Sequence, residues 1–142
     1  MSIKLVGAAI ALSLFAAGAA HAATLSFAAS MNAAQEVPPK ASAGTGDMVG
    51  QLDTATKTFT YTVTFQGLTG PATMAHFHGP AAPGVNAGVE VPLGMAPTSP
   101  IHGTKVLTDV QISDLEAGKW YVNVHTAANP GGEIRGQVLP KK

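Results

Sequence analysis

The sequence predicts an all-β fold, an antiparallel Greek-key β-sandwich or barrel of about eight short strands. Two observations support this prediction. No stretch of the 142 residues keeps a helical periodicity over three turns, whereas alternation of apolar and polar residues recurs along the chain. Glycine and proline, with 16 and 10 copies, are spread between the alternating segments, as turn residues are in all-β proteins.

The clearest strand is 57–66, where Phe59, Tyr61 and Val63 alternate with threonines and so give one apolar and one polar face. The expected strands in chain order are 24–31, 46–52, 57–66, 73–78, 89–93, 103–111, 120–126 and 133–139. Turn residues separate them at 53–57, 79–80, 83–84, 86–88 and 129–132. One helical turn is expected at 113–118, with Ser113 as its N-cap and Gly118 as its stop.

The beginning of the chain has the pattern of a secretory signal peptide. Lys4 precedes an apolar run over 5–19, and Ala20-His21-Ala22 is a small-x-small cleavage pattern. The run of about 15 residues is shorter than the roughly 20 that span a bilayer, which disfavours a membrane anchor. We therefore expect a signal peptide at 1–22, a β domain at 23–142, and a mature protein in the periplasm or secreted.

Composition restricts the partners and the sources of stability. The sequence has no cysteine, so packing, alone or with a metal, must stabilise the exported domain. Removing Lys4 from the eight basic residues leaves seven against eight acidic ones. This balance provides no basic patch, so we expect no nucleic acid and no anionic membrane as a partner.

The strongest functional signal is a set of three histidines on two expected strands. Residues two apart in a strand point the same way, so Met74, His76 and His78 share one face. In the segment 120–126, His125 lies on a face opposite the apolar residues. Imidazole suits Cu, Zn and Ni, and the thioether of Met74 would favour Cu(I). The pattern predicts an outward-facing metal site of His76, His78 and His125, with copper as the expected ion.

Polar neighbours extend this expected outward face. The short loop 129–132 predicts a hairpin that sets Tyr121, Asn123 and His125 beside Glu133, Arg135 and Gln137. Glu133 is expected to ligate the metal or to orient a histidine ring. Tyr121, Asn123 and Arg135 are the residues expected to form a recognition face for a protein or glycan if no metal binds.

Each of these residues also fits a plainer interpretation. His76 and His78 are compatible with solvated strand residues, and His125 with a hydrogen bond across the hairpin. Glu133 and Arg135 are compatible with a cross-strand ion pair worth under about 1 kcal/mol. Met74 is compatible with a core position, and His102, after a proline loop, with plain surface.

Four segments of the chain resemble the CHRD domain, which is named for its repeats in chordin. They are QEVPP at 35–39, AHFHGP at 75–80, WYVNVHT at 120–126 and NPGGEIRGQ at 129–137. The resemblance covers essentially the whole mature chain and implies an extracytoplasmic all-β module. It implies little about activity, although chordin itself binds growth factors. Carried over residue by residue, it marks the positions His76, His78, Asn123, His125, Glu133 and Arg135.

No enzymatic activity is expected. The sequence contains no recognisable Ser-His-Asp spacing, and Glu133 has no evident carboxylate partner for acid–base work. The His-x-His strand is also similar to copper–zinc superoxide dismutase, but the cysteine pair is missing and the loop 79–88 contains no histidine or aspartate. The leading hypothesis is an exported copper-binding protein without catalysis. The alternative is an extracytoplasmic recognition module without metal.

Overall fold

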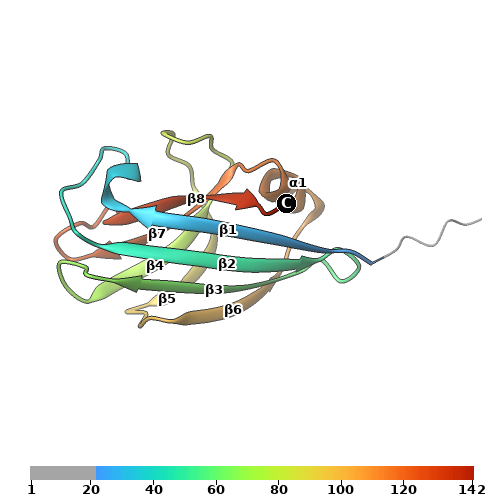
Figure 1. Cartoon of the computed structure of the whole chain (residues 1–142), viewed down its shortest axis with the longest axis horizontal. Coiled ribbons are helices and arrows are strands. Elements are labelled where there is room, and N and C mark those ends of the chain that lie inside the picture. Colours follow the sequence, from blue (N-terminus) through green and yellow to red (C-terminus); the bar gives the residue numbers. More distant parts are fainter. Residues whose placement is uncertain (1–21) are drawn as a thin grey trace, which may run out of the picture.

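The structure, a computed structural model, describes residues 22–142, so all of the expected signal peptide except Ala22 lies outside the described residues. These residues form eight strands, one short 3-10 helix and one α-helix (Figure 1). The elements are β1 Thr24–Asn32, η1 Ala33–Gln35, β2 Thr45–Asp53, β3 Thr58–Gln66, β4 Ala72–His78, β5 Val89–Met95, β6 Ile101–Val106, α1 Asp109–Glu116, β7 Trp120–Thr126 and β8 Ile134–Pro140. The all-β prediction with about eight strands is confirmed.

The eight strands form a single antiparallel sheet in the order β5-β4-β7-β8-β1-β2-β3-β6. The sheet folds over on itself, so that β1, β2, β3 and β6 make one layer and β8, β7, β4 and β5 the other (Figure 1). The end strands β5 and β6 contact each other, so the sheet nearly closes into a barrel.

The core fills the space between the two layers with the apolar side of each strand. Phe59 and Tyr61 from β3 meet Phe77 from β4 and Trp120 from β7 in edge-to-face contacts, with ring centroids 5.1–6.5 Å apart. Offset and edge-to-face pairs of this kind are the favoured arrangement of aromatic rings. The alternation in β3 therefore selects the core side as expected, except at Phe65, which is only partly buried near the end of the strand.

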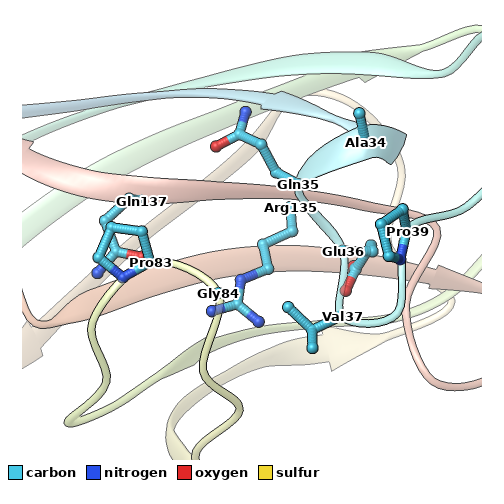
Figure 2. Close-up of a pocket in the computed structure, with 9 residues that line it drawn as sticks. All are labelled: Ala34, Gln35, Glu36, Val37, Pro39, Pro83, Gly84, Arg135 and Gln137. Carbon is cyan, nitrogen blue, oxygen red and sulfur yellow. The ribbon is translucent and has the colours of Figure 1, made fainter.

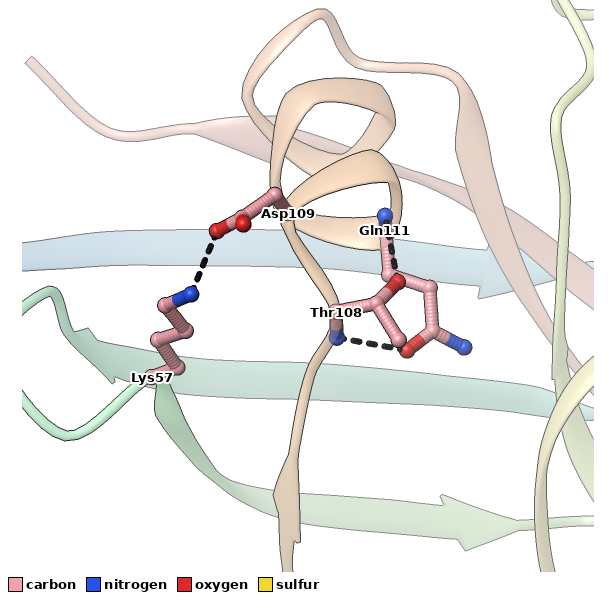
Figure 3. Close-up of polar contacts among 4 residues, drawn as sticks. All are labelled: Lys57, Thr108, Asp109 and Gln111. Carbon is pink, nitrogen blue, oxygen red and sulfur yellow. Dashed lines mark hydrogen bonds and ion pairs between the residues drawn. The ribbon is translucent and has the colours of Figure 1, made fainter.

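The segment after β6 departs from the prediction, which extended a strand over 103–111 and placed a helical turn at 113–118. The strand ends at Val106 and α1 begins at Asp109. Thr108, not Ser113, is the N-cap (Figure 3): its hydroxyl accepts from the Gln111 backbone, and the Gln111 side chain accepts from the Thr108 backbone. This capping box satisfies two helix-terminal donors at once.

An ion pair at 2.7 Å joins Lys57 to Asp109 at the start of α1 (Figure 3). Both side chains are exposed, so the pair adds little to stability. Among residues 22–142, no helix is long and apolar enough to cross a membrane.

Candidate metal site

The three predicted histidines converge on one face of the β4–β7 pair. His76 and His78 alternate along β4, and His125 lies on the neighbouring strand β7. Each ring offers one nitrogen, and the three nitrogens lie within 4.8 Å of one another. His76 Nδ1 is 3.0 Å from His125 Nε2. The structure thus brings the three side chains together, as a shared ligand set requires.

Backbone carbonyls fix the orientation of two of these rings. His78 Nδ1 is 3.0 Å from the carbonyl oxygen of Ala87, and His125 Nδ1 is 2.9 Å from that of Pro130. Because a carbonyl only accepts, the tautomer with its hydrogen on Nδ1 satisfies both contacts. In a neutral ring the lone pair then resides on Nε2, which points into the cluster in both residues. A ring held through its second nitrogen by a backbone carbonyl is the usual arrangement of metal-ligating histidine.

Asn123 adds an oxygen to the same space. Its Oδ1 lies 3.0 Å from His78 Nε2 and 3.0 Å from His125 Nε2. Its amide group lies beside the buried carboxylate of Glu36 and lowers the pKa of that carboxyl, as a donor does. With its NH₂ group directed at Glu36, Asn123 presents its oxygen to the two rings. In this tautomer the two Nε2 lone pairs and the Asn123 oxygen converge, and His76 Nδ1 is the neighbouring ring atom that can donate, to His125 Nε2. The lone pair of His78 Nε2 and the Asn123 oxygen still face each other, an arrangement that a cation stabilises.

Protonation of His76 or His78 does not supply that cation at neutral pH. Burial lowers the pKa of His76 to about 4, with smaller contributions from the charges of His125 and His78. Burial also lowers the pKa of His78, although its hydrogen bonds oppose the shift. These two rings are consequently neutral near pH 7, the state in which imidazole binds metal without first losing a proton.

The expectation that this face is open to solvent is wrong. Tyr121, Asn123, His125 and Arg135 are all at most 6% exposed, and His78 is 9% exposed. The loop 79–88 covers the face, since Arg135 donates to Asn86 Oδ1 at 2.9 Å and to the carbonyl of Val85 at 2.6 Å. Only His76 and Met74 keep partial exposure among the expected ligands.

The residues expected to form a recognition face are instead engaged inside the protein. The Arg135 guanidinium carbon lies 3.4 Å from the centre of the Tyr121 ring. The His78 ring stacks on Tyr121 with a centroid distance of 4.7 Å and an interplanar angle of 4°. Since β4 and β8 flank β7 on opposite sides, the two groups cover opposite faces of the tyrosine. This stack holds the His78 ring in place and leaves Tyr121 and Arg135 without a free face for a partner.

Glu133 does not join the histidines, contrary to the expectation. Its carboxylate is fully buried and accepts five hydrogen bonds, from the hydroxyls of Ser42, Thr69 and Thr126, the backbone N–H of Thr69 and the side chain of Asn129. Burial alone would raise the pKa of Glu133, but these donors outweigh it and hold the pKa at about 2. The residue joins three loops of the fold and is not part of the metal site.

The carboxylate that lies beside Asn123 is that of Glu36, not that of Glu133. Glu36 is 4% exposed, and among the described residues its Oε1 has no hydrogen-bond partner. Burial raises the pKa of Glu36, while the charge of Arg135 and the Asn123 amide oppose the shift. Its only signal in the sequence was its position in the QEVPP segment of the CHRD resemblance, to which no role was attached.

A pocket of about 370 Å³ lies beside these buried groups, between η1 with the loop after it and the loop 79–88. In Figure 2, Glu36 and Val37 lie on one side and Pro83 on the other, with Arg135 between them. Its mostly apolar lining contains no histidine. The pocket is therefore separate from the nitrogen cluster, although its Glu36 lies beside Asn123 and its Arg135 stacks on Tyr121.

A nearly closed antiparallel barrel with its histidines on the outer side of β4 and β7 defines the class of protein, an all-β domain with a candidate metal site. Residues 27–138 match the CHRD domain, and the chain therefore belongs to the CHRD domain family. Neither a curated protein sequence nor a solved structure matches the chain.

Proposed function

We propose that this CHRD domain protein is exported and binds a copper ion through His76, His78 and His125, without catalysing a reaction. The observation that carries the proposal is the convergence of acceptor atoms: the Nε2 atoms of His78 and His125 each lie 3.0 Å from the Asn123 oxygen, and the three histidines offer nitrogens within 4.8 Å of one another. Burial of uncompensated lone pairs is unfavourable, and a bound cation removes that cost.

Copper is favoured over zinc by the ligand set. Divalent affinity at nitrogen sites rises to Cu²⁺ and falls again at Zn²⁺. His76 is the adaptable ligand, since among the described residues its ring has no hydrogen bond except to His125. His78 and His125 are the preorganised ligands because backbone carbonyls already fix their rings.

Export is supported by the position of the expected cleavage site, which lies just before the first strand. The expected cleavage site follows Ala22 or Ala23, and the first strand begins at Thr24, so cleavage would remove none of the sheet. The mature N-terminus is expected at Ala23 or Thr24, and mass spectrometry of the periplasmic or secreted protein tests this. An intact Met1 terminus on protein recovered from the cytosol would contradict export.

The alternative, a recognition module without metal, retains little structural support. Its three residues Tyr121, Asn123 and Arg135 are buried and already bonded within the chain. A macromolecular partner would have to displace the loop 79–88 to reach them. Metal binding requires no such rearrangement.

The test is a Cu(II) competition titration against a chromophoric chelator at pH 7. His78→Ala and His125→Ala should each weaken binding by about 10–100-fold or more, because each removes one of few ligands. His102→Ala is the matched control, since its ring contacts Thr62 on the other layer and lies outside the cluster. Urea unfolding of each metal-free variant checks that the fold is retained. Equal Cu(II) affinity in the wild type and in a folded triple variant lacking all three histidines would refute the proposal.

A further inference from the structure

Two methionines extend the histidine cluster toward the edge of the sheet. The strand register places Met95 on β5 opposite Met74 on β4, and Met74 in turn opposite His125 on β7. Residues directly opposite in an antiparallel pair point to the same face, with Cβ atoms about 4.5–5.5 Å apart. Met95, Met74 and His125 therefore form one row across three strands, and His76 lies on the same face two residues after Met74.

This row leads from the buried cluster to solvent. His125 is buried, Met74 and His76 are half-buried, and Met95 is 78% exposed on the edge strand β5. The other two rings of the cluster are held by loop carbonyls, His78 by Ala87 and His125 by Pro130, whereas the His76 ring contacts no loop carbonyl within hydrogen-bonding distance among the described residues. The methionine row thus borders the side on which the cluster remains accessible.

Packing does not explain the position of Met95. Met31 and Met48 are at most 2% exposed and belong to the core, as methionine in a β-sandwich usually does. Met95, by contrast, is the most exposed of the large apolar side chains in residues 22–142. Removing its thioether would cost the fold little, so its sulfur is free to act as a ligand.

We propose that Met74 and Met95, together with the half-buried His76, form a second copper site that is selective for Cu(I). Thioether sulfur is a soft ligand that prefers Cu(I), whereas the imidazole cluster suits Cu(II). Methionine has three rotatable bonds, which lets the two sulfurs on the neighbouring strands β4 and β5 reach one ion. His76 belongs to both sets, so the two oxidation states bind at overlapping positions. The inference rests on the proposed copper function and specifies which form of copper the open edge accepts.

The experiment is an anaerobic Cu(I) titration of the mature protein against a Cu(I)-specific chelator, paired with the Cu(II) titration. The double variant Met74→Leu/Met95→Leu keeps side chains of similar size and removes both thioethers. Cu(I) affinity should fall by at least about tenfold, while Cu(II) affinity should stay within about twofold of the wild type. Met48→Leu, in the core, is the control and should change neither value.

X-ray absorption of the Cu(I) complex provides a second readout. Sulfur scatterers should be present in the wild type and absent in the double variant. An unchanged Cu(I) affinity in the double variant, or a wild-type Cu(I) spectrum without sulfur, would overturn the inference even if Cu(II) binds as proposed. Sulfur-ligated Cu(I) in a protein that fails to bind Cu(II) would support the methionine site and refute the three-histidine function instead.

Discussion

Replacing Glu133 by glutamine should lower the free energy of unfolding at pH 7 by about 3 kcal/mol. The reason is that the five hydrogen bonds donated to the buried carboxylate are strengthened by its negative charge, which glutamine lacks. The hydroxyls of Ser42, Thr69 and Thr126 donate to it at 2.5–2.6 Å. Glutamine presents an NH₂ group where one of the two oxygens stood. The hydroxyls can rotate to accept from that group, but the Asn129 NH₂ and the Thr69 backbone N–H cannot.

The magnitude follows from the pKa of Glu133. It falls from 4.5 to about 2 in the folded protein, and each pKa unit corresponds to about 1.4 kcal/mol. Because the folded pKa is the lower one, the stabilisation is fully present above about pH 4.5 and is lost as the pH falls toward 2. The pKa of His76, lowered from 6.5 to about 4, makes stability fall as the pH drops from about 6.5 toward 4, but it does so equally in wild type and variant. The difference in unfolding free energy between wild type and variant therefore reports the contribution of the Glu133 charge alone.

The assay is urea unfolding of the wild type and of Glu133→Gln at pH 7, 5 and 3, monitored by the fluorescence of Trp120. The difference in unfolding free energy should be close to constant at the two higher pH values and clearly smaller at pH 3. Glu116→Gln, on the exposed end of α1, is the matched control and should stay within about 0.5 kcal/mol of the wild type. A difference below 1 kcal/mol at pH 7, or one that does not shrink at pH 3, would refute this account of the charge.

Two further pairs of substitutions test the core and the support of the candidate metal site. Phe59→Ala should destabilise the fold by about 3–5 kcal/mol and Phe65→Ala by clearly less, since only Phe59 is fully buried, and equal urea midpoints would show that the packing is misassigned. Gly132→Ala should cost about 1–3 kcal/mol and weaken Cu(II) binding, because Gly132 has a φ of +123° and an added Cβ would strike the Glu36 carboxylate and the Asn123 amide. Gly131→Ala meets no atom within 4 Å and should leave both properties unchanged in the same titrations.

The fold was predictable because its signal is local. The alternation of Phe59, Tyr61 and Val63 with threonines has a period of two, which any half-buried strand imposes on its own sequence. The same rule placed His76 and His78 on one face. The helix start at Asp109 was missed, although Thr108 and Gln111 have the spacing of a capping box.

The covering of the site was not predictable because it depends on contacts between distant segments. Asn86 donates to the carbonyl of Val37 at 3.0 Å and accepts from Arg135, and each of these bonds joins residues 49 apart in sequence. Strand alternation distinguishes the core face from the other face, but it does not show which loops fold over the latter. Glu133 was misassigned for the same reason, since its partners come from loops far along the chain.

The most direct test of the central claim is the metal content of the mature protein purified without a histidine tag from the compartment where it accumulates. The account predicts about one copper ion per chain, lost when His78 and His125 are both replaced by alanine in a variant that still folds. Wild-type protein that contains no copper and takes up none when Cu(II) is supplied would contradict it.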